Sequence, residues 1–249
     1  KESLPRGAEP KMGAISTGLG EIYMWTVEYE HPNGEGADIA PEGEPGWKQD
    51  GKYLTPEGEL LSNAFERAAY LRTVQDWVVR PQLKGVPGVA GVDVIGGYVK
   101  QYQVQPDPQK LVSLGLGFSD LVHVLERNNA SIGAGYIEQN GEAYVVRSEG
   151  RIESAEQIGN TVVANRGVPI YLKDVARVGI GKELRTGSAS QNGEEVVVGT
   201  ALMLIGENSR TVSEAVDQKL AEINRTLPPD VRAKTLLNRT KLVDRTIGT

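Results

Sequence analysis

The chain has 249 residues, 39% of them hydrophobic, and a formal net charge of −6. This length suits one large domain or two modest ones, and mild acidity without a basic patch argues against a nucleic acid partner. Cysteine is absent, which excludes disulfides, thiolate metal sites and a cysteine nucleophile, and no apolar run reaches the 18 residues of a membrane helix.

The first part of the chain predicts a strand, a helix and a second strand. Aromatic and β-branched residues favour strands over 22–29 and 89–95, and Pro87-Gly88 separates the second strand from a helix over 70–83. That helix is expected to face inward with its apolar residues Leu71, Val74, Val78 and Trp77. Trp25, within the first strand, is expected in the core.

Residues 31–58 form a Gly- and Pro-rich stretch with six acids, two lysines and no periodicity. Such a composition predicts a solvated, mobile loop. The alternative is a metal-collecting role for its carboxylates and His31, which binding would have to order.

Residues 98–181 separate this first unit from a similar one and are long enough to be a domain. Asn140-Gly141 is the strongest hairpin signal, flanked by apolar residues on both sides. Ser119 is expected to cap a helix over 120–127, and Ser154 with Gln157 predicts a capping box. Further elements are expected as strands over 99–105, 161–164 and 170–172 and a short helix over 109–114.

The strand–helix–strand pattern returns between Glu195 and Leu237. A strand over 195–204 precedes a helix that Ser209 is expected to cap, and a strand over 231–237 follows. Two such units build the split βαβ, ferredoxin-like arrangement. We therefore expect an α+β protein with a split domain of residues 1–97 and 182–238 and an inserted mixed α/β domain of residues 98–181. Residues 239–249 continue at helical spacing.

Enzyme motifs are missing from the sequence. There is no Gly-rich phosphate loop before a helix, no GxSxG and no HExxH, and the two histidines, His31 and His123, lie far apart. We therefore expect a protein that is not an enzyme and carries no resident cofactor.

Two acids stand out by position and are our candidate metal ligands. Glu21 follows the small-residue loop 15–20 and opens the first strand. Asp93 lies inside an apolar run, where Asp is disfavoured in a strand. Carboxylates suit divalent cations. For Asp93 the alternative is simple exposure to solvent on an amphipathic strand.

Several segments closely resemble one family along nearly the whole chain. They include ISTGLGEIYMWTVE, QDWVVRPQL, GAGYIE, IGKELRTG, MLIGENSR and LVDRTI. The chain is similar to the heavy-metal branch of the resistance–nodulation–division efflux pumps, and most similar to the cobalt–zinc–cadmium type of inner-membrane subunit.

The resemblance implies the periplasmic portion of a trimeric proton antiporter of the bacterial inner membrane. Its partners would be a periplasmic adaptor and an outer-membrane channel, and its substrate a divalent metal ion. The split domain would be the porter subdomain and residues 98–181 the docking subdomain, with residues 239–249 leading to a membrane helix outside this chain. Glu21 falls in the matching GLGEIY motif, at a cleft position where zinc-type members use acids.

Two alternatives are weighed beside metal efflux. The same architecture can export organic compounds, but pockets for those are lined by aromatic residues, and aromatics are 6% of this chain. A free-standing ligand-binding or assembly module is the other alternative. A chain that begins at Lys1 and stops within a helical pattern is expected to be a piece of a longer protein.

Overall fold

The computed structural model describes residues 20–128, 132–139, 142–148, 154–185 and 187–241, with the backbone alone for 132–139 and 142–148. The chain divides into two compact units, one formed by the described parts of 1–99 and 184–249 and the other by those of 100–183. These borders lie within two residues of the expected ones, 97/98 and 181/182.

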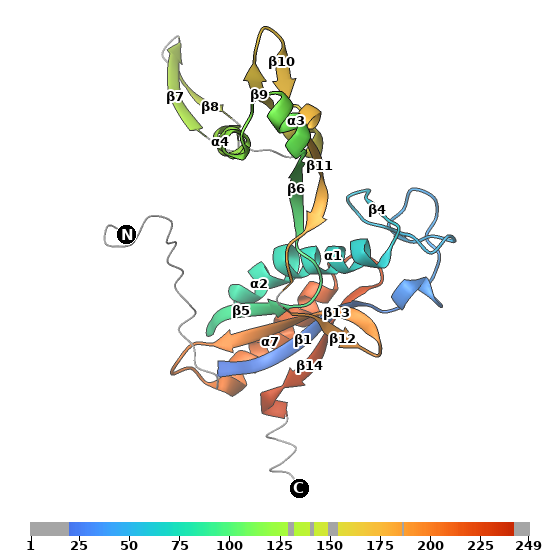
Figure 1. The fold of residues 1–249 in the computed structure, drawn as a ribbon. Coiled ribbons are helices and arrows are strands. Elements are labelled where there is room, and N and C mark those ends of the chain that lie inside the picture. Colours follow the sequence, from blue (N-terminus) through green and yellow to red (C-terminus); the bar gives the residue numbers. More distant parts are fainter. Residues whose placement is uncertain (1–19, 129–131, 140–141, 149–153, 186, 242–249) are drawn as a thin grey trace. The chain divides into compact units, whose positions relative to one another are not determined.

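The first unit is built on a five-stranded antiparallel sheet with the order β12-β13-β1-β14, in which β5 also pairs with β13 (Figure 1). Its strands are β1 (Glu21–Tyr29), β5 (Val89–Ile95), β12 (Ala189–Gln191), β13 (Glu194–Met203) and β14 (Val231–Asn238). Its helical segments are α1 (Ala64–Val74), the π-helical turn η3 (Gln75–Val79), α2 (Arg80–Lys84) and α7 (Ser209–Asn224). β1 and β13 are neighbours although the second unit lies between them in the sequence, as the repeated pattern predicted.

All these helices pack on one face of the sheet. Trp25, fully buried, donates its indole N–H to Gln75 in η3 at 2.9 Å. Tyr23, two residues earlier on the same face, donates its hydroxyl to Asp217 in α7. The strands of the two strand–helix–strand units therefore form one sheet, and their helices cover one face of it. The predicted split α+β fold is confirmed.

The first helix differs from its prediction in two ways. It begins at Ala64, because Asn63 caps it by accepting a hydrogen bond from the Glu66 backbone N–H. Trp77, predicted to face inward, is 79% exposed. The π-turn adds a residue to the turn and rotates the buried face, so that Gln75 and Val79 point inward. Similarly, α7 is capped by Asn208 and not by Ser209.

The stretch 31–58 is not the mobile loop that its composition predicted, but the main part of a structured segment of residues 31–61. It contains the short helix η2 (Pro32–Gly34) and a small sheet of β2 (Gly46–Trp47), β3 (Tyr53–Leu54) and β4 (Leu60–Leu61). Trp47 and Tyr53 are buried and contact Tyr29 of β1, with ring centroids 5.3 and 5.1 Å from the Tyr29 ring. Tertiary aromatic contacts, which leave no periodic pattern, hold this segment on the core.

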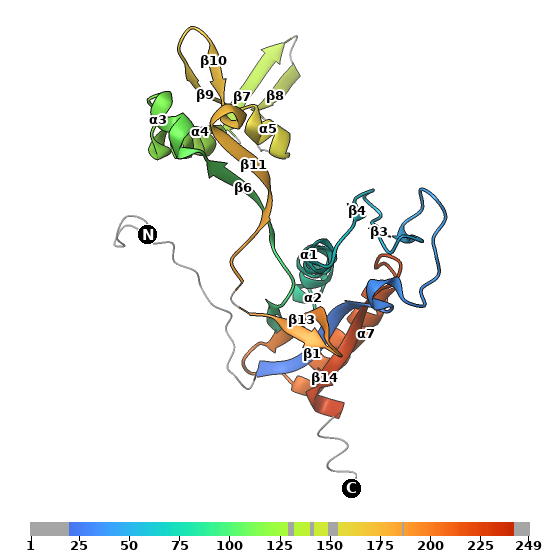
Figure 2. The ribbon, with the colours of Figure 1, turned by 45° about the vertical axis from the view of Figure 1, so that its right-hand side comes forward.

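The second unit, whose strands and helices are drawn in Figure 2, carries its own small core. β6 (Lys100–Pro106) and β11 (Ala176–Lys182) pair along their whole lengths, and β9 (Val162–Asn165) pairs with β10 (Pro169–Tyr171). The remaining elements are α3 (Pro108–Ser113), α4 (Phe118–Asn128), β7 (Ile132–Gln139), β8 (Glu142–Ser148), α5 (Ala155–Gly159) and α6 (Leu172–Val175). The core consists of Leu111, Leu121, Ile158, Leu172, Val175 and Ala176.

Local predictions for this unit fared unevenly. Ser154 caps α5 by accepting from the Gln157 backbone N–H at 3.1 Å, as expected. Ser119 lies inside α4 and does not precede it. β7 and β8 form the predicted hairpin, with Asn140-Gly141 outside the described residues.

Candidate functional site

Glu21 and Asp93 lie on the same face of the five-stranded sheet. Glu21 pairs with Leu202 and Asp93 with Thr200, from the two strands that flank β13. A register shift between Glu21 and Tyr23 interrupts the alternation of β1, so Glu21 lies not on the helix-facing side with Tyr23 but on the side of its partner Leu202. Thr200 and Leu202 are two positions apart, so these four side chains lie on one face. This is the face away from the helices, since Ala201 between them is buried on the helix side. Glu21 and Asp93 are both exposed.

The two carboxylates do not form a closed metal cage. β1 and β5 are separated by β13, so the strands that carry them lie about 10 Å apart. Within the described residues, no group of three or more His, Asp or Glu side chains could hold a metal ion together. In the described part of the chain, this face therefore presents two separate, exposed carboxylates and no preformed metal cage.

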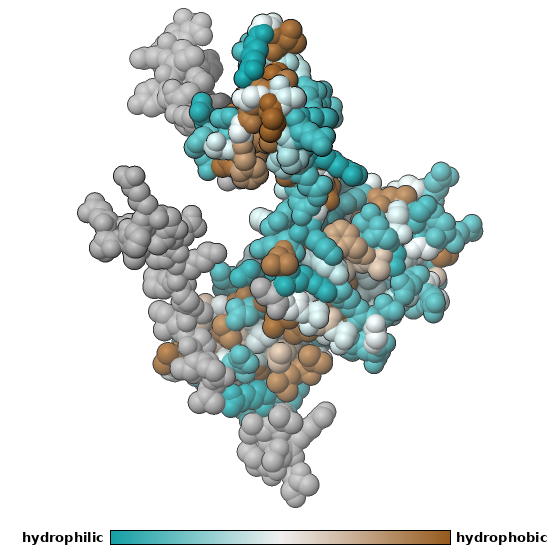
Figure 3. All heavy atoms as spheres, viewed as in Figure 1, coloured by the Kyte–Doolittle hydropathy of each residue, from teal (hydrophilic) through white to brown (hydrophobic). Residues whose placement is uncertain are grey.

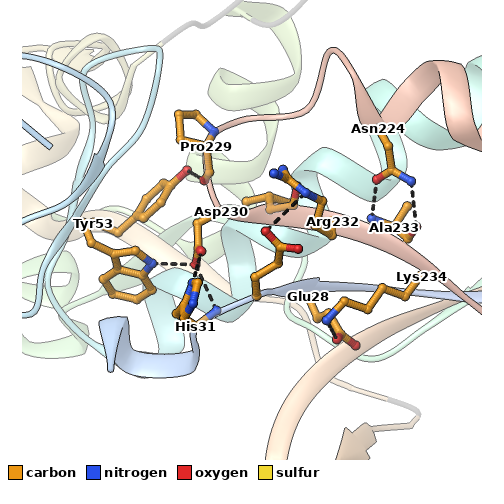
Figure 4. A network of polar contacts seen from close by, with 12 residues as sticks. Glu28, His31, Tyr53, Asn224, Pro229, Asp230, Arg232, Ala233 and Lys234 are labelled. Atoms are coloured by element: carbon orange, nitrogen blue, oxygen red, sulfur yellow. Dashed lines mark hydrogen bonds and ion pairs between the residues drawn. The ribbon is translucent and has the colours of Figure 1, made fainter. Parts of the chain in front are cut away.

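A third acid on this face, Glu28, is already engaged. It is 9% exposed, accepts a hydrogen bond from the Thr26 hydroxyl at 2.7 Å and pairs with Lys234 of β14 at 2.7 Å (Figure 4). Its two partners, a hydroxyl and an ammonium group, therefore hold this buried carboxylate in place. Glu28 was not singled out from the sequence, because its partner lies some two hundred positions along the chain.

Asp230, directly before β14, links the segment 31–61 to the start of that strand through side-chain hydrogen bonds (Figure 4). Its carboxylate accepts from the Trp47 indole N–H at 2.7 Å and lies 2.6 Å from Nδ1 of His31. Tyr53 donates its hydroxyl to the Pro229 carbonyl at 2.6 Å, and burial raises the pKa of this phenol, which therefore stays protonated. His31 is thus part of a structural latch, and its metal-collecting alternative finds no cluster among the described residues.

A pocket of about 340 Å³ opens at one end of the sheet. The pairing of β1 with β13 ends at Val27 and Val197. Beyond these residues, β1 remains paired only with β14, and β13 is paired with β12. The two strands diverge, and α1 closes one side of the gap. The charged lining residues include Glu28, Arg67, Glu194 and Lys234. No local sequence signal marks this pocket, because tertiary pairing alone brings its walls together.

Comparison with known proteins decides the family. The AcrB/AcrD/AcrF family matches residues 1–249, the whole chain. The chain belongs to this family. The resemblance inferred from its motifs is therefore confirmed, and so is the heavy-metal branch, by the relatives described next.

The chain is 54% identical to the nickel and cobalt resistance protein CnrA of Cupriavidus metallidurans over 250 residues, which cover 100% of this chain and 23% of that protein. It is 53% identical to the nickel-cobalt-cadmium resistance protein NccA of Alcaligenes xylosoxydans xylosoxydans, with the same coverage. It is 51% identical to the cobalt-zinc-cadmium resistance protein CzcA of Cupriavidus metallidurans, covering 100% of this chain and 21% of that protein. The chain thus spans about a fifth of the length of these relatives.

Solved structures show the same fold. A crystal structure of a heavy metal efflux pump superposes with a TM-score of 0.75 at 27% identity, over 99% of this chain and 22% of that one. In the described part of this chain, no helix is long and apolar enough to cross a bilayer.

Proposed function

We propose that the chain is the periplasmic part of a proton-driven efflux transporter for divalent heavy-metal cations of the zinc, cobalt and cadmium type. The observation that carries this proposal is identity above 50% over the full chain to three proteins named for resistance to such metals. The metal is the substrate, and the proposal includes neither a resident cofactor nor an enzymatic reaction. In the cell, the inner-membrane pump would work as a homotrimer with a periplasmic adaptor and an outer-membrane channel.

The five-stranded unit would serve as the porter subdomain, and Glu21 and Asp93 would line the metal path. Support comes from their shared face and their exposure. A carboxylate that supplies one or two of a cation's ligands releases it when neighbouring groups move, whereas a full cage retains it. The remaining ligands would come from parts of the pump outside this chain.

The composition of this face favours metal over organic substrates. The side chains that the strand register places there include Met24, Thr26, Val198, Thr200 and Leu237, and none of the described residues of this set is aromatic. Pockets for organic compounds are lined largely by aromatic and other apolar groups. An exporter of organic compounds is therefore the weaker alternative.

The second unit would be the docking subdomain, and the β7–β8 hairpin would contact a neighbouring subunit. A two-stranded hairpin is marginally stable alone. Exposed apolar side chains elsewhere in this unit, including Val112, Phe118 and Val168, agree with a surface that meets other chains, and Figure 3 shows apolar residues among hydrophilic ones on the visible face of this unit. Deleting residues 139–142 should therefore weaken trimer formation or channel docking, measured by cross-linking in membranes; unchanged assembly would contradict this role.

Glu21→Gln in the full-length pump tests the metal path. The variant should lower resistance to zinc or cobalt at normal expression, because the amide binds divalent cations more weakly than the carboxylate. Growth of a metal-sensitive bacterial host on graded metal concentrations measures this. Glu222→Gln, on an exposed site of α7 paired with Lys219, is the matched control and should keep full resistance. Wild-type resistance of the Glu21 variant to every metal tested would remove Glu21 from the path.

A further inference from the structure

The pocket where β1 and β13 diverge has the size and mixed lining of a small-molecule site. Its volume of about 340 Å³ falls in the range of ligand pockets. It lies wholly within the first unit, at the opposite end of β1 from Glu21. An apolar wall is formed by Phe65 and Leu71 of α1 and by Tyr98, whose ring meets that of Phe65 edge-on at 4.8 Å.

Most charges around this pocket are already neutralised by the chain itself. Glu28 pairs with Lys234, and Glu195 pairs with Arg185, whose guanidinium also lies 4.2 Å above the Tyr98 ring. Glu30 pairs with Arg232 at 3.3 Å. These pairs fix the walls and leave little net charge to attract a simple ion.

Two charged groups of opposite sign remain, Arg67 and Glu194. In the part of the chain that the structure describes, neither has an ionic partner, and both contact the neutral amide of Asn33. Arg67 donates to Asn33 Oδ1 at 2.7 Å, and Asn33 Nδ2 donates to Glu194 Oε1 at 3.1 Å. The amide oxygen thus holds the place of a carboxylate, and the amide nitrogen holds the place of an ammonium group.

Asn33 occupies this position with a strained backbone. Its φ is +59°, in the left-handed region that non-glycine residues seldom adopt. Gly34 follows at φ +78°, where a Cβ would lie 2.9 Å from the Trp47 ring. Strain of this kind often marks a functional position. The hydroxyl of Tyr29, a lining residue that is 7% exposed, has no hydrogen-bond partner among the described residues.

We propose that this pocket binds a small zwitterion of the α-amino acid class that displaces the Asn33 amide. The ligand carboxylate pairs with Arg67, the ligand ammonium pairs with Glu194, and an apolar side chain packs against Phe65 and Leu71. Two ion pairs, in which both partners are charged, replace two hydrogen bonds in which only the protein group is charged, and this favours the ligand. The site uses neither Glu21 nor Asp93, so a result that contradicts the proposed metal path would not contradict this site, and the reverse also holds.

The test uses the indole N–H signals of the three tryptophans in the ¹⁵N-labelled 249-residue chain, with L-leucine as the probe. Arg67 lies 5.7 Å from the centre of the Trp47 ring, so binding should move the Trp47 signal saturably and leave those of Trp25 and Trp77 unchanged. Butylamine and pentanoate, which each carry one of the two charges, should bind at least about ten-fold more weakly. No saturable shift up to about 20 mM L-leucine would overturn the proposal.

Variants locate the binding groups. Arg67→Gln and Glu194→Gln should each lower affinity for L-leucine by about ten-fold or more, whereas Arg80→Gln and Glu222→Gln, surface charges outside the pocket, should not. Asn33→Gly, which suits a positive φ, should bind at least as tightly because the competing amide is gone. Weaker binding by this variant would overturn the displacement. A Trp47 shift with nickel chloride alone that Glu194→Gln abolishes would overturn the zwitterion in favour of a metal site.

Discussion

Trp25 shows how a single residue determines its neighbours in the sheet. Its ring lies across β13 at Gly199, where a Cβ would come within 2.3 Å of the indole. Only a glycine at position 199 lets the Trp25 ring approach the β13 backbone this closely. Any side chain there would collide with the ring, which is fully buried and hydrogen-bonded to Gln75.

Gly199→Ala should destabilise the first unit by about 1–3 kcal/mol, because the added methyl forces the ring or the strand to shift. Urea unfolding followed by circular dichroism measures the change. Gly179→Ala is the control: a Cβ there meets nothing within 4 Å, and its φ is not positive, so stability should change by less than about 0.5 kcal/mol. Equal effects of the two substitutions would show that the Trp25 contact does not limit packing.

Asp217 makes the free energy of unfolding depend on pH in the acid range. Burial opposes its ionisation, but the hydrogen bonds from Tyr23 and Lys241 outweigh burial and lower its pKa. Because the folded pKa lies below the unfolded one, the carboxylate stabilises the protein above the unfolded value, near 3.9, and this contribution disappears as pH falls through the folded pKa.

Asp217→Asn should therefore be less stable than the wild type at neutral pH by up to about 1 kcal/mol, a modest loss because the side chain is 36% exposed. The two stabilities should converge as pH falls below about 4. Thermal unfolding across this pH range measures the difference. A gap that stays constant down to acid pH would assign the loss to packing rather than to charge.

At the scale of elements, the segment 31–61 depends on a few aromatic anchors. Trp47, 1% exposed, packs on Tyr29 and Tyr53 and donates to Asp230. Each of its strands is two residues long, so backbone pairing alone cannot maintain the segment.

Trp47→Ala should cost about 3–5 kcal/mol locally, as for a large core aromatic. Hydrogen exchange should then show loss of protection over 46–61, while β1 and β13 stay protected. Trp77→Ala removes the same side chain from a site that is 79% exposed and should leave exchange unchanged. Loss of protection in β1 as well would mean that the segment is integral to the sheet.

Elements with a local signal in the sequence could be predicted, and elements made by tertiary contacts could not. β1 and β13 follow from their runs of β-branched and aromatic residues, and α7 follows from the spacing of Val212, Val216 and Leu220. Trp77 was misplaced because a π-turn breaks the 3.6-residue period that the prediction assumed. The small sheet of residues 46–61 carries no period at all.

The candidate sites follow the same division. Glu21 could be chosen from the sequence because it stands where a small-residue loop enters a strand, and Asp93 because Asp is disfavoured inside an apolar strand. Strand register then places them on one face. Arg67, Asn33 and Glu194 lie on three separate elements, and no local pattern in the sequence links them. Only the divergence of β1 from β13 brings them together, and no single-residue signal encodes it.

At the scale of the whole molecule, the two units have separate cores. The larger core draws its residues from 22–92 and 197–233, and the smaller from 111–176. The second unit begins and ends side by side, because Lys100 pairs with Lys182 in the β6–β11 ladder. Antiparallel partners lie about 5 Å apart at Cα, so a short connection can replace this whole unit.

Replacing residues 100–183 with Gly-Ser-Gly between Val99 and Leu184 should leave the first unit folded. Its free energy of unfolding should change by less than about 1 kcal/mol, since a shorter loop costs slightly less entropy to close and no core residue is lost. Tryptophan fluorescence during urea unfolding reports on this unit alone, because Trp25, Trp47 and Trp77 all belong to it. We expect a single cooperative transition at nearly the wild-type urea midpoint. The indole N–H of Trp47 should also stay protected from hydrogen exchange, because its hydrogen bond to Asp230 is kept. A broad unfolding transition, or loss of hydrogen-exchange protection at the Trp25 indole N–H, would show that the first unit needs the inserted unit in order to fold.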